Sequence, residues 1–339
     1  MTHKFLAIAV TATIVSGCST ETGETTETEI AQAQGEEANP DRNVYFGDLH
    51  IHTKNSFDAY IFNVRTTPDD AYEFGQGGTI KHPLGYDLKL EGPPLDFMAV
   101  TDHAAYLGHL EAMNSPDTKL SKLDMAKDMF STDPEKIMSA FQLIGGAVRD
   151  GKKMDGVYDP AIVGNVWKQT VASADKYNQP GKFTTFAAYE YTATRVTRGK
   201  DNGFAGGNLH RNVIFRGSAA DMPFATIDSP NPEDLWTWMD DQREAGNDVM
   251  SIPHNSNVSD GEMFKLETYD GQPLTKAYAD KRMRNEPLVE ITQVKGTSET
   301  HPSLSPNDEW ADFEIYDKLL SSMVTSKTNT GDYIRQAIA

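Results

Sequence analysis

The chain has 339 residues, with 31 lysines and arginines against 50 aspartates and glutamates, which gives a formal net charge of -19. This acidic balance argues against a protein that binds nucleic acid through its phosphates, so we expect no nucleic acid partner. The single cysteine excludes an intramolecular disulfide, a cysteine-rich zinc module and an iron–sulfur cluster. Any bound metal must therefore be held by His, Asp and Glu.

Residues 1–18 are predicted to be a lipoprotein signal peptide. The apolar run over residues 5–15 is too short to span a bilayer, and Val15-Ser16-Gly17-Cys18 resembles a bacterial lipobox. We expect an acylated Cys18 to anchor an extracytoplasmic protein to a bacterial membrane. Because Ser19 rather than Asp follows, we expect the outer membrane, on its periplasmic side or surface. An ordinary signal peptide with a chance cysteine is the alternative.

Residues 19–40 carry six glutamates and no lysine or arginine, and they show no apolar period. Such a segment buries too little apolar surface to fold, so we expect a disordered acidic tether. The folded domain is then expected over residues 41–339.

The domain is predicted to alternate strands and helices. Apolar runs predict strands at residues 44–46, 95–101, 184–191, 212–215, 248–252 and 288–292. Their near-continuous hydrophobicity favours buried parallel strands. Asp-Pro or Asn-Pro pairs predict helices over 133–149, 159–176 and 231–246. The pattern indicates an α/β fold with a mostly parallel sheet or barrel, and residues 107–179 form a helical excursion without strand signals.

Metal-ligating residue types recur at the predicted strand ends. His50 and His52 are spaced i and i+2, so on an extended segment their side chains share one face and can share a metal. Further strand ends supply His103, Glu190 and His254, with His210 less firmly placed. In parallel α/β folds these ends form the face on which sites are built.

Together these motifs resemble the polymerase and histidinol phosphatase (PHP) superfamily. Residues 46–53 with Ser56 and Asp58 resemble its first motif, and Thr101-Asp102-His103 its second. Glu190, the run Leu209-His210-Arg211-Asn212 and the run Ile252-Pro253-His254-Asn255 resemble the later motifs in order. The resemblance covers residues 43–295 apart from the helical excursion. It is closest to a secreted PHP-like family of unknown function.

The resemblance implies a distorted (β/α)7 barrel with two or three divalent metals at its mouth. The ligands it implies are His50, His52, Asp58, His103, Glu190, His210 and His254, with Glu190 bridging two metals. The family adds a late Asp-x-His pair, and no such pair follows His254 here. We therefore expect a chain truncated before its closing strand, with an incomplete site. Should it be complete, His301, beside Glu299, is the candidate to finish the site.

The predicted chemistry follows from the metals. A His and carboxylate cluster suits Zn, Mn or Fe, which activate water for attack on a phosphorus atom. Arg211 and Lys295 are candidates to bind phosphate oxygens, with surface charges or carboxylate partners as the alternative. Asp102 and Asp48 are candidates to orient an imidazole, and Asp48 is equally suited to cap a turn.

Three functional hypotheses remain open. The first is a metal-dependent phosphoesterase acting on a small extracytoplasmic molecule. The second keeps the metal-dependent hydrolysis and changes the bond to an amide, a sulfate ester or a lactone. The third is a non-catalytic lipoprotein that binds metal or another ligand, but seven ligands exceed the four of a closed structural site. The sequence has no Gly-x-Ser-x-Gly elbow and no P-loop lysine, which argues against the corresponding nucleophile and nucleotide sites.

Overall fold

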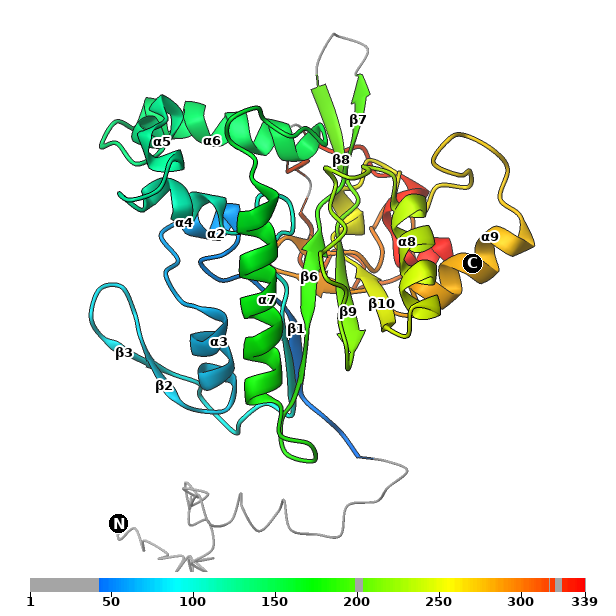
Figure 1. Ribbon diagram of the computed structural model, residues 1–339. Helices are drawn as coiled ribbons and strands as arrows, with labels where there is room; N and C mark the ends of the chain where they lie inside the picture. The colour runs from blue at the N-terminus through cyan, green and yellow to red at the C-terminus, as the bar shows by residue number, and fades with distance from the viewer. Residues whose placement is uncertain (1–42, 199–203, 317, 321–324, 339) are drawn as a thin grey trace, which may run out of the picture. The chain divides into compact units, whose positions relative to one another are not determined.

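A computed structural model describes residues 43–338 except 199–203, 317 and 321–324 (Figure 1). The predicted signal peptide and acidic tether lie outside the described residues. Residues Tyr45–Ala339 form one folded unit. Within the described ranges, no helix combines the length and hydropathy that crossing a bilayer requires.

The first sheet is parallel and has the order β1-β4-β5. Strand β1 (Gly47–Ile51) pairs with β4 (Phe97–Val100), which pairs with β5 (Thr184–Phe186). Most of β4 is buried, as expected for a strand covered on both faces. The predicted strand at 95–101 is thus confirmed with narrower bounds, whereas the predicted strand at 184–191 is divided between this sheet and the next.

The second sheet has the order β10-β9-β6 and is antiparallel. Strand β9 (Arg211–Arg216) pairs on one side with β6 (Ala188–Tyr191) and on the other with β10 (Asp248–Pro253). The hairpin of β7 (Thr194–Arg198) and β8 (Phe204–Asn208) joins β6 to β9 and reverses the chain without a crossover helix. The predicted parallel arrangement is therefore wrong for β9, which runs antiparallel to both of its neighbours.

The two sheets meet where β5 runs into β6. Only Ala187 separates the two strands, and its carbonyl accepts a hydrogen bond from the Phe215 amide at 2.9 Å. A parallel bridge also joins His103, beyond β4, to Glu190 in β6. Strands β4, β6 and β10 consequently run in one direction, and β9 runs against them. None of the sheets over the described residues closes into a barrel.

Two strand predictions at the ends of the fold are wrong. Residues 44–46 are exposed and precede β1, which starts at Gly47. A Cβ at Gly47 would lie 2.3 Å from the Phe97 carbonyl oxygen, so glycine allows this close pairing. Residues 288–291 form no regular strand. Only a two-residue strand β11 (Thr292–Gln293) pairs with β12 (Gly296–Thr297).

The three predicted helices are confirmed. They are α6 (Pro134–Arg149), α7 (Pro160–Tyr177) and α8 (Pro232–Glu244). Asp133, Asp159 and Asn231 each cap one of these helices, because the side-chain oxygen accepts a hydrogen bond from a first-turn amide. Proline at the first position adds a fixed backbone angle.

The helical excursion is also confirmed, since α4 (His109–Asn114) and α5 (Asp124–Met129) precede α6 and α7 there. The remaining elements are α2 (Phe57–Ile61), α3 (Pro68–Gly75), β2 (Thr79–Lys81), β3 (Asp87–Lys89), α9 (Lys276–Asn285) and α10 (Ile334–Ala337), with 3-10 turns at Leu120–Lys122, Ser256–Val258 and Thr330–Asp332. Helix α7 packs against β4 and β5, and α8 against β10 (Figure 1).

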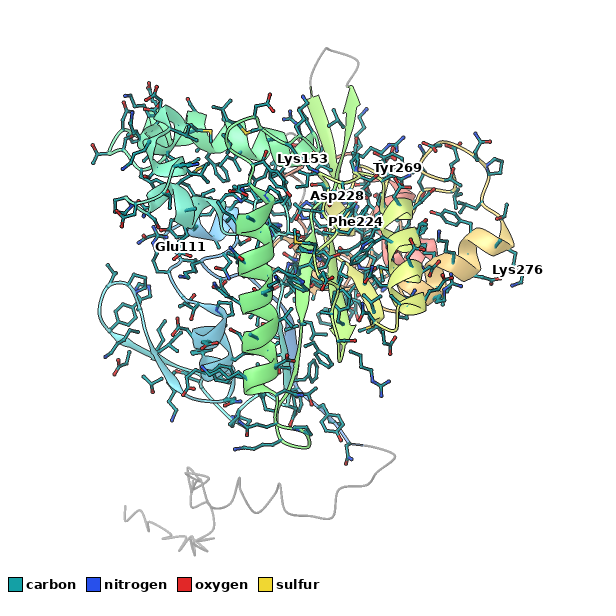
Figure 2. The ribbon with its side chains drawn as sticks, viewed as in Figure 1. Glu111, Lys153, Phe224, Asp228, Tyr269 and Lys276 are labelled. Atoms are coloured by element: carbon teal, nitrogen blue, oxygen red, sulfur yellow. The ribbon has the colours of Figure 1, made fainter. Side chains whose placement is uncertain are left out.

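The excursion packs on the connection between β9 and α8. The Trp167 indole in α7 donates to the Ala220 carbonyl at 2.7 Å, and the Thr226 hydroxyl donates to the Val148 carbonyl at 3.2 Å. Lys153 and Asp228 form an ion pair at 3.7 Å across the same contact (Figure 2). The insertion therefore belongs to the main core rather than to a separate domain.

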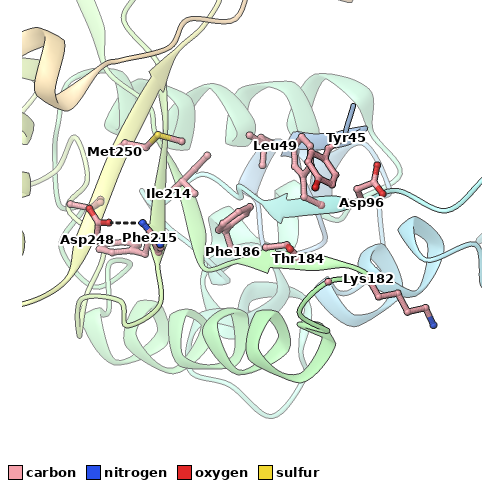
Figure 3. Close-up of a pocket in the computed structure, with 14 residues that line it drawn as sticks. Tyr45, Leu49, Asp96, Lys182, Thr184, Phe186, Ile214, Phe215, Asp248 and Met250 are labelled. Atoms are coloured by element: carbon pink, nitrogen blue, oxygen red, sulfur yellow. Dashed lines mark ion pairs between the residues drawn. The ribbon is translucent and has the colours of Figure 1, made fainter. Parts of the chain in front are cut away.

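A small apolar cluster fills the space between the two sheets: Ala99, Ala188, Ile214 and Ile252, with Leu49, Phe186 and Met250 partly buried beside it. It opens into a cavity of about 660 Å³. The cavity lies where β4, β5 and β10 begin, and an Arg216–Asp248 ion pair lies on its border (Figure 3). We call it the apolar cavity.

Candidate metal centre

The opposite ends of these strands carry the ionisable side chains. His50 lies in β1 with His52 just after it, His103 follows β4, and His254 follows β10. His210 precedes β9, and because β9 runs against its neighbours, its start lies beside their carboxyl ends. The reversed strand therefore settles the position of His210, which was uncertain from the sequence.

Glu190 lies at the middle of this group. Its side chain is 1% exposed and contacts five imidazoles. Oε2 lies 3.4 Å from His50 Nε2, 3.1 Å from His52 Nε2 and 3.6 Å from His254 Nε2, while Oε1 lies 3.1 Å from His103 Nδ1 and 2.7 Å from His210 Nδ1. The two oxygens of one buried carboxylate are too few to accept a good hydrogen bond from each of five imidazoles. Cations bound between the carboxylate and the imidazole nitrogens would use the same groups as ligands.

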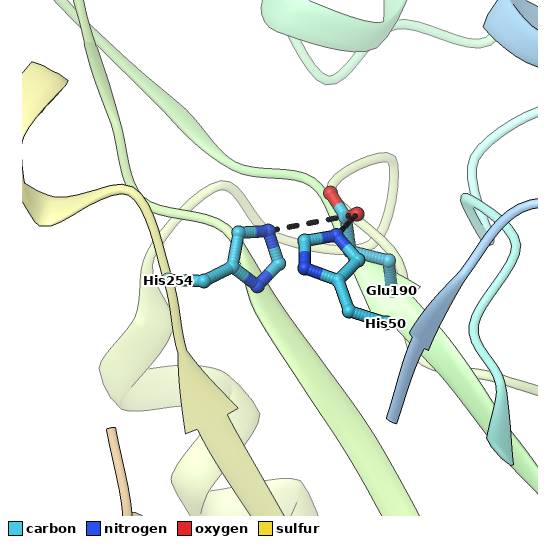
Figure 4. A group of neighbouring side chains, drawn as sticks. All are labelled: His50, Glu190 and His254. Atoms are coloured by element: carbon cyan, nitrogen blue, oxygen red, sulfur yellow. Dashed lines mark ion pairs between the residues drawn. The ribbon is translucent and has the colours of Figure 1, made fainter. Parts of the chain in front are cut away.

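Two sets of three residues could each hold a metal ion. One is His50, Glu190 and His254 (Figure 4), and the other is His52, His103 and Glu190. Within each set the donor atoms lie within 4.8 Å of one another. Imidazole nitrogen and carboxylate oxygen suit Zn, Mn or Fe, so the residues fit the expected metals. Glu190 belongs to both sets, as a bridging ligand would.

Asp58 borders the second set. Its carboxylate lies 3.3 Å from His103 Nε2 and 3.7 Å from His52 Nδ1. The side chain is 36% exposed, so it faces the opening of the site. All seven predicted ligands therefore lie together, although metal binding by them stays a prediction.

Polar side chains contact ring nitrogens of three histidines. His52 Nδ1 lies 2.9 Å from the Ser56 hydroxyl, and His103 Nδ1 lies 2.5 Å from the Thr192 hydroxyl. His50 Nδ1 lies 2.9 Å from a Glu290 oxygen. Such contacts fix the ring orientation of a metal-ligating histidine.

The carboxylates raise the pKa of three histidines. Burial opposes the charge of His50, but Glu190 and Glu290 outweigh it and raise its pKa to about 9. Burial and the neighbouring His103 likewise oppose protonation of His52, yet Asp58 and Glu190 raise its pKa to about 9. For His103, burial is outweighed by Glu190 and Asp58, which raise the pKa to about 10.

The pKa values of the other four candidate ligands are lowered. Burial would raise the pKa values of Glu190 and Asp58, but the surrounding imidazoles lower both. Burial and the charge of His50 lower the pKa of His254 to about 3, although the Glu190 carboxylate acts to raise it. Burial also lowers the pKa of His210, with His103 and Lys295 adding to the effect. Without metal the site thus contains protons that a cation would displace.

The two aspartates predicted to orient an imidazole bind backbone and hydroxyl groups instead. Buried Asp102 accepts hydrogen bonds from the Thr53 amide at 2.5 Å and the Thr53 hydroxyl at 2.7 Å. It thereby joins the loop after β1 to the end of β4. Asp48 accepts from the His50 amide at 2.9 Å, which favours its turn-capping alternative. Both act on the backbone that carries the histidines.

The two predicted phosphate-binding cations have different surroundings. The Arg211 side chain is buried and donates to Glu286 at 2.5 Å and to the Leu209 carbonyl. This placement argues against its predicted role, because the guanidinium is buried and paired with the Glu286 carboxylate. Lys295 is half-buried, and its charge acts on His210. It remains a candidate.

The other histidines over the described residues take no part in this group. His301 contacts Ser303 at 2.8 Å and packs near Tyr333, so it does not complete the site. His82 stacks on Tyr86 beyond β2. His109 is buried and accepts from the Asp159 amide at 2.9 Å, which is a structural role. Glu299 instead pairs with Arg335.

Glu290 and Thr192 were missed by the sequence reasoning, and Ser56 was named only as part of the first motif, without a role. Glu290 carried a signal, because it is a lone acid within the apolar run 288–292, just as Glu190 is within 184–191. Thr192 carried none, since isolated hydroxyl residues are common in loops.

A family model described as a protein of unknown function (DUF3604) matches residues 39–339. The chain belongs to this family. Comparison with curated proteins and with solved structures finds no match.

Proposed function

We propose that the protein is a metal-dependent hydrolase of the phosphoesterase type, acting on a small extracytoplasmic molecule. The observation that carries the proposal is the buried Glu190 with five histidines around it. A structural metal site needs about four ligands and leaves no open position. Two overlapping three-residue sets, with Asp58 at the opening, favour an open site with two ions.

We also propose that the fold is a PHP-type barrel. Support comes from the parallel sheet β1-β4-β5, its continuation through β6, and the gathering of the predicted ligands at one end of the strands.

In the proposed reaction, bound divalent ions would activate water and neutralise charge on a phosphate ester. The chain itself supplies the ligands and their orientation. Asp58, the most exposed of the seven candidate ligands, would hold a metal near the opening. Lys295, whose charge acts on His210, would supply a positive charge for an anionic substrate.

Two alternatives differ in the bond or in the presence of catalysis. The same site would activate water against an amide, a sulfate ester or a lactone. A non-catalytic metal- or ligand-binding lipoprotein would hold metal and hydrolyse none of these. The charge of Lys295, which acts on His210, favours an anionic substrate over a lactone.

The test combines metal analysis with hydrolysis assays on the purified protein. We expect about two ions per chain and turnover of an aryl phosphate monoester or diester. His52→Ala should lose metal and turnover together, whereas His82→Ala, in the β2–β3 hairpin, should lose neither. Two bound ions with hydrolysis only of a sulfate ester, an amide or a lactone would support the second hypothesis. One closed four-coordinate ion and no turnover would contradict the proposal.

We further propose that Cys18 carries a lipid anchor, a position outside the described residues. Its support is the lipobox-like Val15-Ser16-Gly17-Cys18. Cys18→Ser should move the protein from the membrane fraction to the soluble fraction. Soluble wild-type protein without lipid on Cys18 would contradict this.

A further inference from the structure

Glu290 lies behind His50, on the side of the ring that faces away from Glu190. The Glu290 oxygen Oε2 is 2.9 Å from His50 Nδ1, while His50 Nε2 lies 3.4 Å from Glu190. An imidazole can offer only one nitrogen to a cation at the centre. Nε2 is that nitrogen here, and Nδ1 is left to Glu290.

Glu290 is held in place independently of any ion. Its amide donates to the carbonyl of Pro253 at 3.0 Å, directly before His254. Its second oxygen, Oε1, accepts a hydrogen bond from Gln293 Nε2 at 2.8 Å. One oxygen is therefore occupied by Gln293, and the other points at His50.

These contacts determine where the His50 proton sits. A carboxylate can only accept, so the 2.9 Å contact requires a proton on Nδ1. Gln293 Nε2 also lies 3.4 Å from Nδ1, but it could donate only to the opposite tautomer. The shorter contact to Glu290 favours the tautomer with a proton on Nδ1. That tautomer leaves the Nε2 lone pair free for a cation.

His52, in the second set of candidate ligands, has a different kind of support at its outer nitrogen. His52 Nδ1 faces the neutral hydroxyl of Ser56, with the Asp58 carboxylate farther away at 3.7 Å. The outer nitrogen of His50 thus has a carboxylate within hydrogen-bonding distance, and the outer nitrogen of His52 does not. A carboxylate raises the basicity of an imidazole more than a hydroxyl does.

We propose that Glu290 is a positioning residue, held by Gln293, that keeps His50 in the tautomer able to bind metal. The ion bound by His50, Glu190 and His254 then depends on Glu290, and the ion bound by His52, His103 and Glu190 does not. This inference rests on the metal centre of the proposed function and assigns different outer support to His50 and His52.

The test measures binding of Zn²⁺ to metal-depleted full-length protein by chelator competition, together with metal content per chain. Glu290→Ala should weaken one of two ions by about 10- to 100-fold and leave the other unchanged. Glu290→Gln should recover part of the loss, because its amide oxygen still accepts from Nδ1. Gln293→Ala should weaken the same ion by a smaller factor. The exposed Glu309→Ala is the matched control and should change neither ion.

The outcomes separate this inference from the proposed function. Wild-type protein that binds no metal would overturn the proposed function itself. Two ions in the wild type and unchanged affinity for both in Glu290→Ala would overturn only the positioning role. If Glu290→Gln lost as much affinity as Glu290→Ala, Glu290 would be a direct ligand and the inference would be wrong. If Glu290→Ala failed to fold, an unchanged Zn²⁺ affinity in Gln293→Ala would overturn it.

Discussion

The two ends of the same strands have opposite chemistry. At the carboxyl ends of β1, β4, β6 and β10, charged and polar side chains surround Glu190. At the other ends, mostly apolar side chains line the cavity of about 660 Å³, together with Asp96, Lys182 and the Arg216–Asp248 ion pair (Figure 3). Between them lies the small apolar cluster around Ile214. The strands thus separate an end where buried charges must be compensated from an end where most side chains are apolar and pack together.

This difference predicts how substitutions at each end behave. Changes at the charged end should alter metal content and the response to pH, because each side chain there pairs with another ionisable group. Changes at the apolar end should alter the free energy of unfolding and leave metal content unchanged. The experiments below test this separation, from the largest expected effect to the smallest.

The largest effect is expected for Glu190→Gln. Glutamine keeps the shape and removes the charge shared by five histidines, so both ions should be lost, with affinities falling by more than about 100-fold. Metal content per chain and hydrolysis of an aryl phosphate measure the effect. His82→Ala serves as the control. Retention of one ion at wild-type affinity would show that Glu190 does not bridge.

Arg211→Met tests a residue at the charged end that faces away from the centre. Glu286 would lose its buried partner, although Arg282 still contacts it at 3.0 Å. We expect a loss of about 3 kcal/mol in unfolding free energy, since breaking buried ion pairs costs about this much. Chemical denaturation measures it. If Arg211→Met kept its stability but had a raised KM for a phosphate ester, Arg211 would instead be a phosphate-binding residue.

The metal-free protein should lose stability as pH rises from about 6.5 to about 10. The folded pKa values of His50, His52 and His103 are raised to about 9 or 10. A raised pKa stabilises the fold fully below the unfolded value of about 6.5, and this contribution disappears as pH passes the folded value. Denaturation at several pH values measures the effect. The metal-loaded protein should show a weaker dependence, because cations replace these protons.

The smallest effect is expected for Ile214→Val beside the apolar cavity. Removing one methylene group from a buried isoleucine costs about 1 kcal/mol. Metal content should stay at the wild-type value. Loss of an ion in this variant would show that packing at the apolar end controls the centre, against the separation described above.

Local sequence determined much of the fold. The helices α6, α7 and α8 were predicted within two residues, because Asp or Asn caps followed by Pro act through nearby backbone groups. Continuous apolar runs likewise located β4 and β10. The candidate ligands could be predicted because they follow such runs.

The tertiary structure decided what depends on contacts between distant residues. The reversal of β9 places His210 beside Glu190 while burying Arg211 on the other side, and no local pattern encodes a strand's direction. The run at 288–292 is apolar but finds no strand partner for most of its length, because pairing requires a neighbouring edge. Its acid, Glu290, instead meets His50, 240 residues earlier. Sequence thus determined which groups are present, and long-range packing decided which of them meet.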